Sequence, residues 1–394
     1  MRKILAGRRG GGKPFVIEID VSKTSAVTGA AGTFKIPVTS GTPTGGGALG
    51  FSVDWGDGTV ESVNSGNFAT AVHTYNPTDA SYPDYTIKCN GSVRGWSFGQ
   101  MASTENDALK VMKISDWGNF IFTESECFQA AGNLNMPNAV GGPLFEGVKG
   151  GDATFRACVN LQTINNIENW NVSNVTSFNL TFDSCRNLTT GTLGSNIDLS
   201  AWDVSNSSTF KGMFSNALSF NGNMFSTVSS TCTDLAQLFL NCRSFNNGTL
   251  ATNTMNSWIT ANVTDLTETF SNALAYDENI SNWDVKNVKF MERTFSGCSN
   301  FNQPIGVWDT TAVTNAGAMF FNCFGFVQDI SSWNMDAISV FNNALPALRG
   351  ASGSFNIGNA NYNALLIAWD AFTYSSMPAN SIWDFGQAQY TLAN

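Results

Sequence analysis

The segment "WDVKNVKFMERTFSGCSNFNQPIGVWD", residues 283–309, begins and ends on the same Trp-Asp pair. The second tryptophan follows the first after 25 residues, and the same spacing relates Trp258, Trp283, Trp308 and Trp333. Trp170 and Trp202 extend the series with a longer step. A recurrence of roughly 20–50 residues is the signature of an array in which each repeat is one supersecondary unit. The segment therefore predicts a repeat architecture for the middle of the chain.

A second ladder, of phenylalanines, runs beside the tryptophans. Its members are Phe128, Phe155, Phe182, Phe214, Phe239, Phe270, Phe295, Phe320 and Phe341. Three residues after each of them stands a small residue, always Cys or Ala: Ala131, Cys158, Cys185, Ala217, Cys242, Ala273, Cys298, Cys323 and Ala344. The two rows predict nine units, each with a short strand before the phenylalanine and an Asn- and Gly-rich bend after it.

One unit of this length cannot cover its own apolar side, so we expect the units to stack and to be held by contacts with their neighbours. Burial of one large aromatic side chain removes roughly 150–250 Å² from water. At about 25 cal/mol per Å² this is worth on the order of 4–6 kcal/mol as an upper bound. The tryptophan recurs because every unit needs the same ring to fill the same space.

The eight cysteines have two interpretations. An even number in a secreted chain is typical of disulfides. Five of them, however, occupy the ladder position at which Ala is the alternative, which selects for a small buried side chain. Free buried thiols are therefore favoured over disulfides. A metal site is not expected, because the chain has no Cys-x-x-Cys pair and a single histidine.

The N-terminal part has the pattern of a small β-sandwich. Residues 51–60, "FSVDWGDGTV", place a Gly-Asp-Gly turn after an alternating apolar run, and "VHTY" (72–75) and "YTIKCNG" (85–91) follow as strand-like runs. "TFKIPV" (33–38) is expected to be an early strand, and the Gly-rich segment 41–50 a loop.

Two features of this part admit a functional reading. Asp54 and Asp57 could bind calcium, but no further acidic cluster stands near them to complete six to eight oxygen ligands. A hairpin turn at Asp57-Gly58, capped by Asp54, is favoured. His73, the only histidine, is expected to be packed or hydrogen-bonded in its strand rather than catalytic.

These motifs resemble a known family. "NISNWDVKNV" and "FMERTFSGCSNFNQPIGVWD", within residues 279–309, are similar to the repeat of BspA-type leucine-rich-repeat surface proteins. The resemblance covers roughly residues 105–375, and "NYNALLIAWDAF" (361–372) is similar to the closing segment of such arrays. Between Asn221 and Ser257 the units lengthen and the tryptophan is missing. The W-G-D-G turn with its following H-x-Y resembles a PKD-type immunoglobulin-like domain.

The resemblance implies a mainly β fold. An N-terminal immunoglobulin-like β-sandwich would be followed by a leucine-rich-repeat-like solenoid of about nine units with a C-terminal cap. We expect a basic Gly-rich arm and lead-in at residues 1–31, the PKD-like sandwich at 32–100, the repeats at 101–345 and the cap at 346–394.

Charge is unevenly distributed. The first 13 residues hold five basic residues and no acid: Arg2, Lys3, Arg8, Arg9 and Lys13. The remainder has 15 basic and 30 acidic residues, and such an acidic body argues against nucleic-acid binding. The chain contains no run of about 18 apolar residues, so no transmembrane helix is expected. The N-terminus lacks the apolar stretch of a secretory signal.

No catalytic motif is present, so we expect a non-enzymatic protein without a cofactor. An enzyme acting on surface glycans would need a carboxylate pair. The acids after the tryptophans, Asp203, Asp284 and Asp309, fit turn capping better. Stacked repeats offer long binding surfaces, and the least constrained positions of the units are predicted to form one: Asn179, Lys211, Gln237, Glu268 and Arg293. Plain solvated surface is the alternative for each of them.

The surface-protein resemblance and the absence of a secretion signal predict a bacteriophage virion protein, a fibre, decoration or tail-associated subunit that functions in structure or host adhesion. It would contact other virion subunits through its N-terminal region, and a host surface protein or glycan through its repeats. It could be an oligomer. The basic arm would anchor it, or would be a solvated tail. The alternative is a bacterial cell-surface adhesin of the BspA kind.

Overall fold

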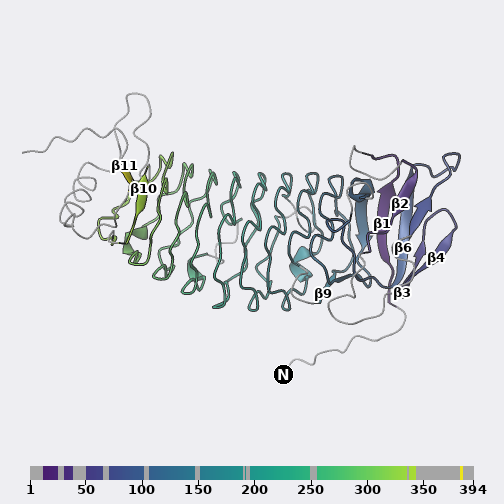
Figure 1. The fold of residues 1–394 in the computed structure, drawn as a ribbon, viewed down its shortest axis with the longest axis horizontal. Coiled ribbons are helices and arrows are strands. Elements are labelled where there is room, and N and C mark those ends of the chain that lie inside the picture. The colour runs from purple at the N-terminus through teal and green to yellow at the C-terminus, as the bar shows by residue number, and fades with distance from the viewer. Residues whose placement is uncertain are drawn as a thin grey trace, which may run out of the picture.

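The computed structural model describes residues 12–24, 31–38, 50–64, 71–101, 106–146, 151–189, 191, 196–248, 255–334, 337–342 and 382–384. The described part is mainly β and contains no α-helix, which confirms the expected class. N-terminal antiparallel sheets lie at one end of a long series of short units (Figure 1).

Five strands with antiparallel neighbours form the larger sheet. Their order is β4-β3-β6-β1-β7, with β1 (Phe15–Asp20), β3 (Gly50–Asp54), β4 (Val60–Asn64), β6 (Asp84–Ser92) and β7 (Val111–Asp116). β2 (Thr33–Lys35) and β5 (Val72–Thr74) pair as a second sheet. Along β6, Tyr85, Ile87 and Cys89 are buried and the residues between them are exposed. Such alternation suits a sheet with one face on the core and one in water.

The larger sheet extends beyond residues 32–100, the range predicted for the sandwich. β1 lies inside the segment expected to be arm and lead-in, yet it pairs with both β6 and β7. β7 lies beyond residue 100 and belongs to the same sheet. These pairings join residues far apart in the sequence, which local patterns do not show. The expected strand at 33–38 is shortened to β2 and a single bridge from Val38 to Trp96.

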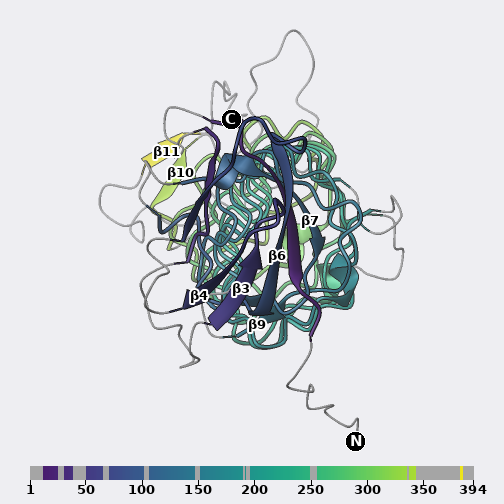
Figure 2. The same ribbon diagram turned by 90° about the vertical axis from the view of Figure 1, so that its right-hand side faces the viewer.

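β7 connects the sheet to the units that follow. One of its edges pairs antiparallel with β1, and on the other Lys113 and Asp116 form parallel bridges with Asn135 and Val140. Just beyond it, the short strands β8 (Ile121–Phe122) and β9 (Leu144–Phe145) pair in parallel. Figure 2, viewed along the long axis, shows the N-terminal sheet lying across the end of the units.

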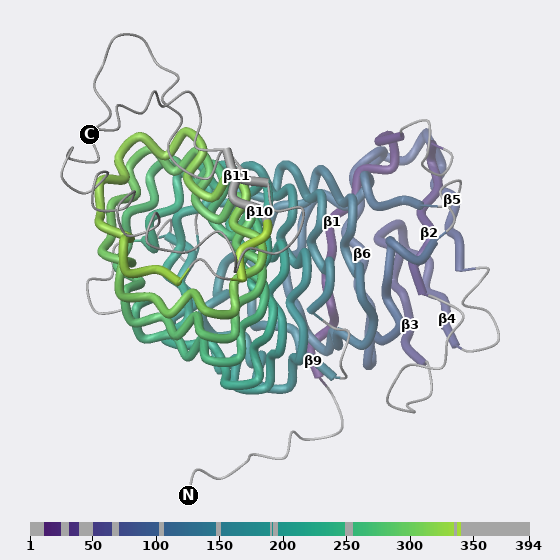
Figure 3. The backbone as a smooth tube through the Cα atoms, turned by 60° about the vertical axis from the view of Figure 1, so that its left-hand side comes forward, coloured from purple at the N-terminus to yellow at the C-terminus, as the bar shows by residue number. Residues whose placement is uncertain are grey.

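Successive units then lie side by side in parallel register (Figure 3). Single bridges join them: Met136–Ile164, Leu144–Asn171, Ser177–Thr209, Thr209–Asp234, Asp234–Asp265, Asp265–Phe290 and Phe290–Asn315. Backbone hydrogen bonds between units extend this pairing, as from Phe270 N to Thr294 O (3.0 Å) and from Asn272 N to Ser296 O (2.7 Å). The backbone groups of one unit are therefore satisfied by the next.

The short strand expected before each phenylalanine is not formed in the described units. Two residues per unit, four apart, instead have positive φ. The first set is Glu126, Ala153, Leu180, Gly212, Gln237, Glu268, Arg293 and Ala318, and the second is Ala130, Ala157, Ser184, Asn216, Asn241, Asn272, Gly297 and Asn322. Left-handed residues break an extended strand into tight bends, and Asn and Gly adopt this conformation at lower cost than most residues.

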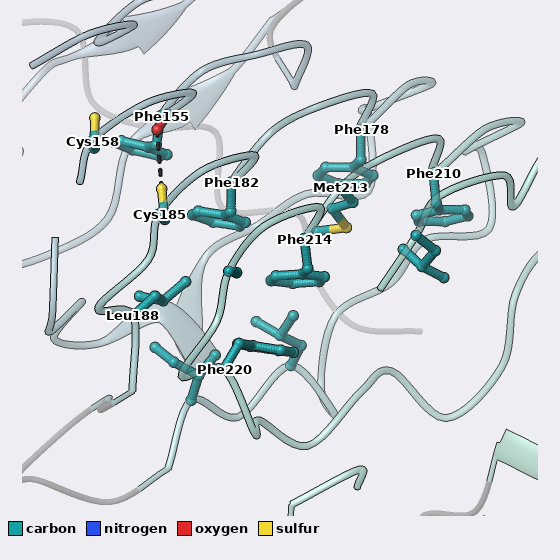
Figure 4. Close-up of a cluster of buried hydrophobic side chains, with 14 of the residues drawn as sticks. Phe155, Cys158, Phe178, Phe182, Cys185, Leu188, Phe210, Met213, Phe214 and Phe220 are labelled. Atoms are coloured by element: carbon teal, nitrogen blue, oxygen red, sulfur yellow. Dashed lines mark hydrogen bonds between the residues drawn. The ribbon is translucent and has the colours of Figure 1, made fainter. Parts of the chain in front are cut away.

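The phenylalanine ladder is a continuous ring stack. From Phe128 to Phe320, neighbouring rings have centroids 5.4–5.9 Å apart and planes within 16° of each other. Figure 4 shows three of them, Phe155, Phe182 and Phe214, on successive units. A second row, Phe220, Phe245, Tyr276, Phe301 and Phe326, repeats at 5.8–5.9 Å. All these rings are buried, as the repeat pattern predicts.

Tryptophans stack in the same manner, with Trp258 and Trp283 at 5.8 Å and Trp308 and Trp333 at 6.3 Å. Their indole N–H groups donate to carbonyls of the preceding unit: Trp202 to Ile167, Trp258 to Phe225, Trp283 to Met255, Trp308 to Ile280 and Trp333 to Ile305. Three-residue 3₁₀ helices precede some of them, η4 (Ile167–Asn169), η6 (Met255–Ser257) and η7 (Ile305–Val307). In the stretch without a tryptophan, Phe225 stacks on Trp258 at 5.1 Å.

All eight cysteines are free and buried, which confirms the favoured interpretation. The ladder cysteines also donate to backbone carbonyls of the preceding unit, as from Cys185 Sγ to Phe155 O (3.1 Å; Figure 4) and from Cys298 Sγ to Phe270 O (2.8 Å). A thiol thus fills the space that alanine would fill and adds a weak hydrogen bond.

Burial raises the pKa of the ladder thiols, for example that of Cys298, well above the ordinary value. We therefore expect none of the eight thiols to react with Ellman's reagent in the native protein, and all eight to react after unfolding in guanidinium chloride. Fast reaction of any thiol before unfolding would contradict the burial of the ladder.

The ninth unit is out of the predicted register. Ser339 N donates to Thr314 O (2.9 Å), as Thr314 N does to Lys289 O one unit earlier. This places Phe341 level with Ala316, four residues before the Phe320 position. Phe341 lies in β10 (Val340–Asn342), which pairs in parallel with β11 (Ile382–Asp384). The predicted cap lies outside the described residues, except for β11.

Candidate binding face

One continuous row of parallel bridges runs along the units from Ser177 to Asn315. We call this row the bridge face and define it as each bridging residue with the three residues that follow it. The bridging residues are Ser177, Thr209, Asp234, Asp265, Phe290 and Asn315.

Side-chain caps shape this face locally. Asp234, Asp265 and Asn315 each accept, through Oδ1, the backbone N–H two residues on, at distances of 2.8–2.9 Å. These Asx turns bend the chain directly after the bridging residue. The third residue after the bridging one then adopts the left-handed conformation. The third residue after each bridge is therefore held in the same orientation from unit to unit.

The structure brings the predicted binding residues onto this one face. Gln237, Glu268 and Arg293 occupy the same left-handed position of consecutive units. Asn179 and Lys211 lie one position earlier, beside Leu180 and Gly212. The five predicted residues therefore occupy two different positions of the unit. Units of unequal length cannot be aligned by a constant spacing, which is why the two positions were mixed.

A hydrogen-bonded row joins side chains across these units. Gln237 Nε2 donates to Glu268 Oε2 (2.9 Å), and the Arg293 guanidinium lies 3.7 Å from Glu268 Oε1 and 3.2 Å from Glu292 Oε1. Asn315 Nδ2 donates to Glu292 Oε2 (3.1 Å). Contacts between the charged members are worth little individually because they are partly solvated. Together they link side chains of four consecutive units.

Several residues of this face were missed by the sequence prediction. Asp234 and Asp265 stand on neighbouring bridges, and Phe290, 43% exposed, stands next in the line. Burial raises the pKa of Asp234, Asp265 adds to the rise, and Lys211 opposes it. Counting seven residues on from Trp258, Trp283 and Trp308 reaches Asp265, Phe290 and Asn315. This constant offset from the tryptophans is the sequence signal that could have identified these bridging residues.

The sequence profile described as "Mycoplasma protein of unknown function, DUF285" matches residues 123–253 and 247–356. These segments together cover more than half of the chain. The chain belongs to this family. The DUF285 segments contain the whole bridge face, whereas residues 1–122, with the N-terminal sheets, lie outside them. No curated protein and no solved structure matches the chain.

The N-terminal turn outside the DUF285 segments has a structural role. Asp54 Oδ1 accepts Gly56 N (3.0 Å), and Asp57 Oδ1 accepts Thr59 N (2.9 Å) in the hairpin between β3 and β4. His73 Nε2 lies 2.7 Å from Asp57 Oδ2, and its ring stacks on Trp55 at 4.9 Å. The favoured readings of the turn and of the histidine are confirmed.

This turn should make stability depend on pH. Burial by itself would raise the pKa of Asp57, but hydrogen bonds from Thr59 and His73 outweigh it and lower the pKa from 3.8 to about 2. The stabilisation is fully present above pH 3.8 and is lost as the pH falls through about 2. We expect Asp57→Asn to weaken the fall of the thermal midpoint between pH 4 and pH 2. An identical acid profile in the variant would contradict this.

The acids after the tryptophans also have structural roles. Asp203, Asp284 and Asp309 each accept the backbone N–H two residues on, at 3.1–3.2 Å, which confirms turn capping.

Of the predicted arm, Lys13 is described and exposed just before β1, and the other four basic residues lie outside the described residues. In the part of the chain that the structure describes, no three His, Cys, Asp or Glu side chains gather as metal ligands. No helix there could span a membrane.

Proposed function

We propose that the protein is a non-enzymatic structural or adhesion subunit, and that its units form a leucine-rich-repeat-like solenoid of about nine units with the bridge face as the binding surface. One observation carries this proposal: Gln237, Glu268 and Arg293 stand at the same position of consecutive units and are hydrogen-bonded or paired to one another. Side chains already held in place lose less conformational entropy on binding.

The setting we propose is a virion, with the protein as a fibre, decoration or tail-associated subunit. Five basic residues precede an acidic body, and this asymmetry would let the N-terminus dock on an acidic neighbouring subunit. The alternative is an adhesin on a bacterial cell surface. The family description favours this alternative, since it names Mycoplasma, a bacterium.

Binding through the bridge face is tested with the pair Glu268→Ala and Arg293→Ala in the full chain. Attachment of the fluorescently labelled protein to host cells should fall at least tenfold, because the row loses its central members. The matched control removes another ion pair, Asp284→Ala with Lys286→Ala, which lies off the bridge face and is exposed. Equal attachment of both double variants would overturn the role of the face.

The setting is tested by where the protein is found. Mass spectrometry of purified virions should detect it at stoichiometric levels, and deletion of residues 1–12, which leaves β1 whole, should lower its occupancy. Recovery from the bacterial surface fraction, and not from particles, would support the alternative and overturn the virion setting. Full occupancy after the deletion would exclude the arm as an anchor.

A further inference from the structure

Phe290 interrupts a polar line. The equivalent bridging residues are Ser177, Thr209, Asp234, Asp265 and Asn315, all of which carry hydrogen-bonding side chains. Phe290 is 43% exposed, whereas the rings of the two stacked rows are buried. A single exposed aromatic ring is ordinary on a protein surface. Its surroundings decide whether it has a use.

Polar residues linked across units follow Phe290 in the chain. Glu292, two residues on, accepts from Asn315 on the next unit and pairs with Arg293. Arg293 also faces Glu268 on the preceding unit. A carboxylate can accept about four hydrogen bonds, and Glu292 accepts one from Asn315 while it pairs with Arg293. Acceptors and donors are thus presented together.

The next unit has small side chains at the positions that match Glu292 and Arg293. Where the Phe290 unit has Glu292 and Arg293, the following unit has Gly317 and Ala318. Gly317 O accepts the Arg293 N–H (2.9 Å), which confirms that the two units are in this register. The face therefore has less side-chain bulk next to Glu292 and Arg293, which leaves room for a flat molecule to reach them.

Charge indicates the class of ligand. On the Phe290 unit and the unit before it, Asp265, Glu268 and Glu292 are opposed by Lys289 and Arg293, so these five residues carry a net charge of only −1. A strongly charged polymer gains little from such a surface. A neutral sugar suits it, because its C–H face packs on an aromatic ring while its hydroxyls donate to carboxylates and accept from a guanidinium.

We infer that Phe290, Glu292 and Arg293, with Asn315, form a binding site for a neutral hexose-type saccharide. This inference rests on the proposed adhesion function and names its ligand class. A protein ligand on the same face is the competing outcome of the test.

The test uses the full chain on an array of neutral hexose oligosaccharides, such as maltohexaose, cellohexaose and mannohexaose, alongside sialylated and sulfated glycans. A neutral oligosaccharide should bind, and saturation-transfer NMR should show contact with its C–H protons. Phe290→Thr, which installs the residue found at position 209, should bind at least tenfold more weakly. Phe290→Tyr should retain binding.

The matched control is Phe324→Thr, at another exposed phenylalanine (61%) off the bridge face, and it should bind as the parent does. Unchanged thermal midpoints would show that all variants are folded. Undiminished binding by Phe290→Thr, or binding of anionic glycans alone, would overturn the inference.

Host envelopes separate this inference from the proposed function. Periodate oxidation of the envelope glycans should abolish attachment, and protease treatment should leave it intact. Attachment that survives periodate but not protease would overturn the saccharide and leave the adhesion function standing. No attachment to untreated envelopes, together with no binding on the array, would overturn both.

Discussion

Replacement of Phe270 by alanine is expected to destabilise the repeat units by about 3–5 kcal/mol, the usual cost of deleting a buried phenylalanine side chain. The Phe270 ring is fully buried and lies 5.7 Å from Phe239, 5.6 Å from Phe295 and 4.0 Å from Tyr276. Because rings contact both neighbouring units, the cavity would weaken two interfaces at once. Urea unfolding, followed by tryptophan fluorescence, measures the loss.

The control for this prediction is Phe324→Ala, whose side chain is 61% exposed. It should change the free energy of unfolding by no more than about 0.5 kcal/mol. Since an array is held by nearest-neighbour contacts, amide exchange in Phe270→Ala should accelerate most in the units on either side. Equal unfolding midpoints for the two variants would mean that the ring stack does not hold the units together.

The second large effect is expected at a buried ion pair beside β7. Lys110 Nζ, in η3 (Ala108–Lys110), lies 2.5 Å from Asp107 Oδ1, and the two side chains are 0% and 2% exposed. Lys110 Nζ also donates to Thr33 O (2.8 Å), and Lys35 N donates to Asp107 Oδ2 (2.7 Å). The pair therefore ties β2 to the segment that enters β7.

Lys110→Met should destabilise the protein by about 3–5 kcal/mol, because it leaves a buried carboxylate without its partner. Adding Asp107→Leu should recover much of the loss, since replacing both members of a buried pair by apolar residues is often tolerated. Thermal unfolding by circular dichroism compares the variants. The exposed pair of Lys286 and Asp284 provides the control: Lys286→Ala should leave the midpoint unchanged. A midpoint equally unchanged in Lys110→Met would disprove the role of the buried pair.

Much of the interior could be predicted from spacing. The ladder phenylalanines, the tryptophans and the small residue three positions after each ladder phenylalanine are buried wherever the structure describes their side chains. Phe341 was misplaced because the last unit shortens the apparent step to 21 residues, and a ladder of identical letters cannot show such a slip. The sequence shows that no tryptophan stands between Asn221 and Ser257. Only the structure shows that Phe225 takes its place and stacks on Trp258.

The candidate site was less predictable. The repeat pattern places Gln237, Glu268 and Arg293 at one position of consecutive units, but it shows neither their mutual contacts nor the exposure of Phe290. Unit lengths between Phe128 and Phe320 vary from 25 to 32 residues. A shift of one position in the alignment of two units gives a side chain different neighbours. An average repeat length does not show how units of unequal length align.

Spacing in the sequence was enough to predict the buried aromatic rows and the small residue beside each phenylalanine, because burial in a repeated unit depends on position within a short segment and on side-chain size. It was also enough for the Asx caps, which act over two residues, but not for the left-handed bends that replace the expected strands. Only the tertiary structure shows that β1 and β7 belong to one sheet, that the Lys110–Asp107 pair is buried against β2, and which residues of neighbouring units lie level with Phe290. These contacts join chain segments through pairing and register between units, and such long-range relations leave no local pattern in the sequence.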